Sequence, residues 1–129
     1  MKNNGQLCIA IGNFAGEPTT LHCQVKRGET YERELFAEVS HWAGIGRATL
    51  RFVTFGLFFF DVDLDGFDDL FMVNGHVFNE ERLRHIPYAQ RPQLFRNLGT
   101  GKFQEVVPSE GTALSRRLIG RGAAYADYD

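Results

Sequence analysis

The sequence predicts an all-β fold, and three observations support this prediction. The apolar segments are short, and turn residues such as Gly, Asn and Asp follow them, which is typical of strands joined by tight turns. The distinctive counts are 14 glycines and 12 phenylalanines in 129 residues. Helical periodicity is weak throughout. With 43% hydrophobic and 23% charged residues, the chain is long enough for one modest domain with a core.

Strands are expected where apolar, β-branched and aromatic residues run together between turn signals. In chain order, the predicted strands and their turns occupy residues 7–14, 20–25, 34–39, 50–60, 70–77, 93–99, 102–107 and 121–129. Residues 80–90 can accommodate one helical turn before a proline-containing loop. The remaining connections are expected to be turns and irregular loops.

Internal repetition indicates how these strands are organised. The aligned segments are 4–13 with 65–74, 21–25 with 94–98, 36–39 with 103–106, and 55–63 with 121–129. Their order is preserved, and a period of about four strands is typical of a β-propeller blade. The prediction is therefore about two blades of four-stranded antiparallel sheet in an incomplete propeller. Repeat one covers about 1–60, repeat two about 61–126, and a third acidic loop starts at 127–129.

The stretch FFFDVDLDGFDDLFMV, residues 58–73, suggests a metal site. Carboxylates packed this densely repel one another unless a positive charge lies among them. Calcium binds six to eight oxygens at about 2.3–2.6 Å, and Gly66 allows the loop to curl around such an ion. The predicted ligands are the carboxylates of Asp61, Asp63, Asp65 and Asp69 and the backbone carbonyl of Phe67. Asp68 is expected to point away from the ion.

Other interpretations of the acidic loop fit less well. An EF-hand needs a glutamate at loop position twelve and flanking helices, whereas Met72 occupies that position and the flanks favour strands. Magnesium prefers fewer protein ligands and keeps its waters. Glycosidase carboxylates stand on opposite sides of a cleft, unlike this linear cluster. The remaining alternative is a solvated acidic turn that binds nothing, because Asp and Gly are ordinary turn residues.

The rest of the sequence predicts no catalytic site. The four histidines lack zinc-enzyme spacing, and no serine lies in a nucleophile elbow. A net charge of −2 indicates no general affinity for nucleic acid, and no apolar run approaches a membrane span. The first residues lead into no signal-peptide core. Cys8 and Cys23 are interpreted as two buried thiols, with a single disulfide as the alternative.

Residues 55–77, FGLFFFDVDLDGFDDLFMVNGHV, resemble an FG-GAP repeat of the VCBS type, as in the integrin α-subunit N-terminal β-propeller. With RPQLFRNLGTGKFQEV and GRGAAYADYD, the chain is more narrowly similar to the repeat region of bacterial ASPIC/UnbV-domain proteins. The resemblance places the FG element on Phe55 and Gly56, and Asn74-Gly75-His76 stands where the GAP element would be. It implies the same calcium ligands as the loop spacing does.

The resemblance also implies a function. Such a module would bind structural calcium and act as a scaffold for extracellular or periplasmic protein or carbohydrate interaction, or for adhesion. The alternative is a non-catalytic scaffold domain of a larger secreted enzyme. In either case the expected partners are neighbouring blades of the parent chain and a protein or carbohydrate ligand.

Overall fold

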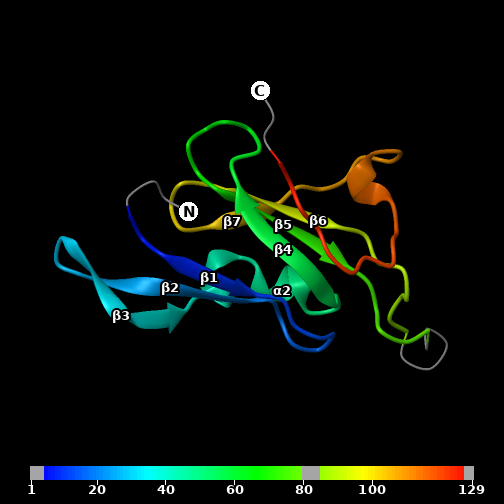
Figure 1. Cartoon of the computed structure of the whole chain (residues 1–129), viewed down its shortest axis with the longest axis horizontal. Coiled ribbons are helices and arrows are strands. Elements are labelled where there is room, and N and C mark those ends of the chain that lie inside the picture. The colour runs from blue at the N-terminus through cyan, green and yellow to red at the C-terminus, as the bar shows by residue number, and fades with distance from the viewer. Residues whose placement is uncertain (1–4, 80–84, 127–129) are drawn as a thin grey trace.

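The computed structural model describes residues 5–79 and 85–126, and these residues form two antiparallel sheets (Figure 1). The first sheet has the order β1-β2-β3, with strands Cys8–Ile11, Thr20–Arg27 and Thr30–Glu38. The second has the order β4-β5-β6-β7, with strands Thr54–Phe60, Asp69–Asn74, Gln93–Asn97 and Phe103–Glu105. The predicted all-β class is confirmed, and each strand lies within or overlaps a segment predicted from the sequence.

The structure contains short helical turns that the sequence did not predict, and the first two of them join the two sheets. They are α1 (Ser40–Ala43), α2 (Gly46–Thr49) and, late in the chain, the 3₁₀ turn η1 (Ala113–Ser115). Gly44 follows α1 with a φ of +90°, a conformation that favours glycine. The helical turn predicted within 80–90 lies partly outside the described residues, and residues 85–90 are not helical.

The junction between β3 and α1 is fixed by Ser40. Its backbone N–H donates to Glu38 Oε1 at 2.7 Å, and its Oγ accepts from Leu21 N of β2 at 2.6 Å. The Ser40 hydroxyl and then its backbone N–H lower the pKa of Glu38, because both hydrogen-bond the ionised carboxylate. Ser40 therefore links the first sheet to the helical turns.

The two sheets share one pairing register, which matches the internal repetition of the sequence. The aligned pairs are Ile9–His22 with Leu70–Phe95, and His22–Glu38 with Phe95–Glu105. Thus the paired residues of β5, β6 and β7 correspond to paired residues of β1, β2 and β3, up to the irregularity between Gln24 and Lys26. Among the described residues, β4 has no counterpart in the first sheet.

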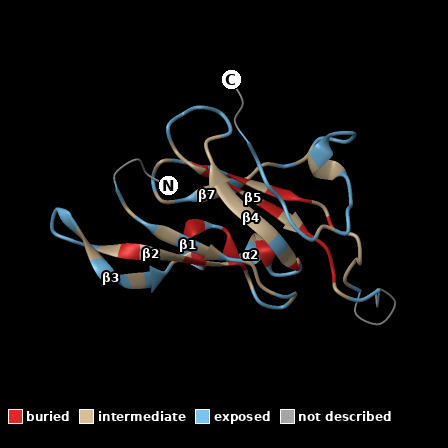
Figure 2. Cartoon of the chain, in the orientation of Figure 1, coloured by how far each residue is buried: buried red, intermediate tan, exposed pale blue. Residues whose placement is uncertain are grey.

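The core lies between the sheets and the helical turns. Its fully buried side chains are Leu21, Ala43, Ile45, Leu70, Met72 and Phe95. Figure 2 shows buried residues on both sheets and on the helical turns between them. Residues from both sheets and from the helical turns therefore contribute to one core, in which β5 and β6 are packed.

The predicted strand at 121–129 is not formed in its described part, residues 121–126. These residues instead cross a face of the second sheet, where the Tyr125 ring lies 5.0 Å from that of Phe58 (Figure 1). The backbone of Ala123 approaches Gly56 so closely that a Cβ at Gly56 would lie 2.7 Å from its nitrogen. Backbone packed on a sheet face forms no ladder, which requires a strand edge.

Cys8 and Cys23 form a disulfide, so the interpretation as two buried thiols is wrong and the stated alternative, a single disulfide, is the one found. They lie directly opposite each other on β1 and β2, with their Cα atoms 4.1 Å apart. The sequence separation of 15 gives no information about this register, which is why the pairing could not be derived from the sequence.

Candidate metal centre

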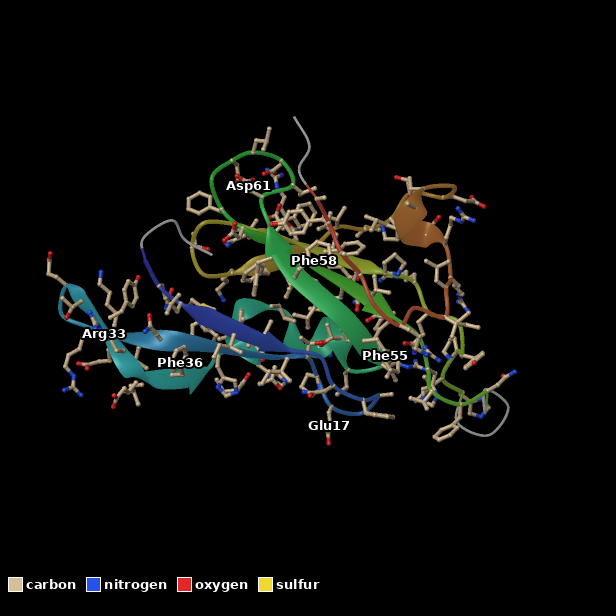
Figure 3. All side chains as sticks on the ribbon, viewed as in Figure 1. Glu17, Arg33, Phe36, Phe55, Phe58 and Asp61 are labelled. Carbon is tan, nitrogen blue, oxygen red and sulfur yellow. A yellow bond between two sulfur atoms is a disulfide. The ribbon has the colours of Figure 1, made fainter. Side chains whose placement is uncertain are left out.

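The acidic loop joins β4 to β5, in a hairpin whose last pair is Phe60 opposite Asp69. It projects from the end of the second sheet, at the top of Figure 1. Figure 3 shows Asp61 at the point where β4 ends and the loop begins. Because both strands are anchored in the sheet, the ends of the loop are fixed, while residues 62–66 between them are solvent-exposed.

Three of the predicted ligands gather in this loop. Asp61, Asp63 and Asp65 each offer one oxygen, and these oxygens lie within 4.8 Å of one another. Oxygens bound to one calcium ion at about 2.3–2.6 Å can be at most about 5 Å apart. The three carboxylates therefore have a spacing that one ion can bridge.

Backbone hydrogen bonds curl the loop around this cluster. Asp61 Oδ1 accepts from Asp65 N at 3.1 Å, and Asp61 Oδ2 accepts from Gly66 N at 2.8 Å. Asp65 Oδ1 accepts from Phe67 N at 2.9 Å. Gly66 has a φ of +86°, as its predicted role in the turn requires. The loop is thus bent by its own carboxylates.

Leu64, at the tip of the loop, is in a strained conformation. Its φ is +59°, and the side chain is 88% exposed. A left-handed backbone costs a residue with a Cβ about 1–2 kcal/mol, and an exposed side chain recovers little through packing. The tight curl that brings the carboxylates together therefore carries a local energetic cost.

The positive charge among the carboxylates is Arg96, on the neighbouring strand β6. Its Nη2 atom contacts Asp63 Oδ2 and lies 3.8 Å from Asp65 Oδ2. The Arg96 side chain is 53% exposed, so this cluster of charges remains in contact with water. Sequence reasoning did not identify Arg96; the available signal was that Arg96 is the one charged residue in the segment 93–98.

Asp69 is placed differently from the other predicted ligands. It is fully buried, its Oδ1 accepts from Asn97 N at 2.7 Å, and its Oδ2 accepts from Val62 N at 3.1 Å. It is not part of the three-carboxylate group. In this structure Asp69 connects the loop to β6, and its role as a calcium ligand stays a prediction.

The neighbours of Asp69 complete the connection between loop and sheet. Asn97 Nδ2 donates to the Asp68 carbonyl at 3.0 Å, so one residue of β6 binds the loop through both its backbone and its side chain. The Phe67 ring packs so close to Gly99 that a Cβ there would lie 2.9 Å from it. The Phe67 carbonyl remains a predicted ligand.

No family model matches the chain, and neither a curated protein nor a solved structure does. None of the helices in residues 5–79 and 85–126 is long and apolar enough to cross a membrane. The functional argument therefore rests on the geometry of the loop and of the two sheets.

Proposed function

We propose that the chain is a calcium-binding β-repeat module in which the ion has a structural role. The observation that carries this proposal is the group of three carboxylate oxygens within 4.8 Å of one another on one hairpin loop. Hard oxygen donors on a curled loop suit calcium, which accepts flexible coordination by carboxylates, carbonyls and water. The ion would stabilise the hairpin by neutralising the negative charges of the loop carboxylates.

The charges in the loop fit a divalent cation. Asp61, Asp63 and Asp65 bring three negative charges, against which Arg96 supplies one positive charge. A bound calcium ion would be held by these carboxylates and by the Phe67 carbonyl. Asp69 is the remaining predicted ligand, and its hydrogen bonds to the backbone N–H groups of Asn97 and Val62 hold the loop against β6.

The repeat architecture we infer is that of β-propeller blades of the FG-GAP/VCBS type, closest to those of ASPIC/UnbV-domain proteins. The shared register of the two sheets supports a structural repeat, and the second sheet is a four-stranded antiparallel meander like a blade. Tyr125 and its neighbours lie on the β4 face, as a following blade would. Neighbouring blades of the parent chain are the partners this proposal requires.

An extracellular or periplasmic scaffold is the setting we propose. The Cys8–Cys23 disulfide supports it, because disulfides persist in oxidising compartments and are rare in the cytosol. Extracellular calcium modules also work at weak affinity, with dissociation constants of about 10⁻⁴–10⁻³ M. A module of this kind would present its loops to a protein or carbohydrate ligand while the ion keeps the blade rigid.

Calcium titration by calorimetry, combined with thermal melts, tests this proposal. We expect one calcium ion per folded chain, weaker binding of magnesium, and a melting temperature that rises with calcium, because only the folded state binds it. Asp63→Asn should weaken binding at least about tenfold, since it removes one charged ligand. The matched control is Asp68→Asn, which makes the same charge change in the same loop.

The control should stay within about threefold of the wild-type affinity, because Asp68 is predicted not to be a ligand. A folded chain that binds no calcium, with a melting temperature unaffected by chelator, would contradict the proposal. Equal losses in Asp63→Asn and Asp68→Asn would show only a general effect of charge.

A further inference from the structure

Arg96 reaches the acidic loop from a different strand of the sheet. Its guanidinium lies against Asp63 Oδ2 and 3.8 Å from Asp65 Oδ2, while its backbone belongs to β6. The next residue, Asn97, is fastened to Asp69 and to the Asp68 carbonyl. The backbone of Arg96 is therefore fixed beside the cluster, and its side chain extends from there to the carboxylates.

The guanidinium and a calcium ion would compete for the same carboxylates. Asp63 and Asp65 both belong to the cluster that would bind the ion, and Oδ2 of each faces Nη2 of Arg96. An arginine cannot lose its proton, so its charge stays in place at every physiological pH. A divalent ion a few ångströms away would repel it, and one of the two cations must leave.

Arg96 is able to leave without disturbing the sheet. Its side chain is 53% exposed, compared with 29% for Asp63 and 33% for Asp65, so its flexible stem can swing into water. A tethered group competes at a high effective concentration, on the order of millimolar. Even a modest ion pair can therefore influence the occupancy of the cluster.

We propose that Arg96 is a built-in competitor of calcium, resting on the proposal that this loop binds the ion. In the calcium-free chain its guanidinium partly neutralises the negative charges of Asp63 and Asp65 and so stabilises the curled conformation of the loop. Calcium displaces it, so Arg96 sets the calcium concentration at which the loop is filled. It also limits how much stability the hairpin loses when calcium is withdrawn.

The test compares calcium affinity and melting temperature in the wild type, Arg96→Gln and Arg33→Gln. Arg33 is the matched control, because it loses the same charge on β3, far from Asp61 in Figure 3. We expect Arg96→Gln to bind calcium about tenfold more tightly, from the size of a close charge–charge term at an exposed site. Its calcium-free form should melt lower, so its rise in melting temperature with calcium should be larger.

Each outcome separates this inference from the function it rests on. Calcium binding that is unchanged or weaker in Arg96→Gln would overturn the competitor role and leave the calcium site standing. Binding by Arg96→Gln alone would overturn the competitor role as stated, because Arg96 would then block the cluster without being displaced by calcium, and it would also contradict calcium binding by the wild type. If the wild type and both variants are folded and none binds calcium, the site and the competitor role both fail.

Discussion

Replacing Asp69 by asparagine tests how strongly this buried carboxylate holds the acidic loop to the sheet when no calcium is bound. Asp69 is fully buried and accepts from Asn97 N at 2.7 Å and from Val62 N at 3.1 Å. Asparagine keeps the shape but has one acceptor oxygen, so its NH₂ group would face a backbone N–H. Losing one charge-assisted hydrogen bond and leaving a buried donor unpaired costs about 2–4 kcal/mol.

The assay is urea and thermal unfolding in the presence of chelator, where calcium cannot contribute. For a chain of this size the expected loss is about 10 °C in melting temperature. Asp63→Asn is the comparison, because in chelator it loses only a half-exposed ion pair with Arg96, worth about 0–1 kcal/mol. The reasoning is refuted if Asp69→Asn unfolds within about 0.5 kcal/mol of the wild type.

Three further predictions concern parts of the fold away from the acidic loop. Replacing both Cys8 and Cys23 by serine should cost about 3 kcal/mol in urea unfolding, since the bridge closes a loop of 15 residues; an unchanged midpoint would contradict this. Gly44→Ala should cost at least about 1–2 kcal/mol in the same assay, because φ is +90° and a Cβ would lie 2.7 Å from the Phe103 carbonyl oxygen. The folded pKa of Glu38 is lowered, so its contribution is present above its unfolded pKa of about 4.3 and lost as pH falls through the folded pKa. Below about pH 4.5, the melting temperature of Glu38→Gln should therefore fall less steeply with decreasing pH than that of the wild type. Equal slopes for the two proteins would contradict this prediction.

Local patterns in the sequence predicted most of the strands, because strand and turn preferences act over a few residues. The spacing of the aspartates likewise predicted that Asp61, Asp63 and Asp65 lie close together, because all three belong to one loop. The helical turns α1 and α2 were missed because four residues are too few to show a helical period. Their positions depend on packing in the core.

Contacts between distant segments could not be derived from the sequence. The Cys8–Cys23 bridge depends on the register of β1 and β2. The approach of Arg96 to the loop depends on the order of strands in the second sheet. The path of residues 121–126 depends on an apolar sheet face that they cover. In each case the local pattern was compatible with several arrangements, and tertiary packing selected one.

The pairing register shared by the two sheets aligns Cys8 with Asp69 and Cys23 with Arg96. The disulfide of the first sheet therefore occupies the position at which, in the second sheet, Asp69 connects the acidic loop to β6. In the first repeat, the residues before β1 lack the acidic spacing of residues 61–69. A covalent bond there fastens β1 to β2 at the end of the sheet. In the second sheet the Asp69 carboxylate connects β5 to β6 by accepting a hydrogen bond from Asn97 N, and Arg96 partly neutralises the negative charge of the acidic loop. The strand end beside the turn is thus fixed in both sheets, by a disulfide in the first and by a buried carboxylate in the second.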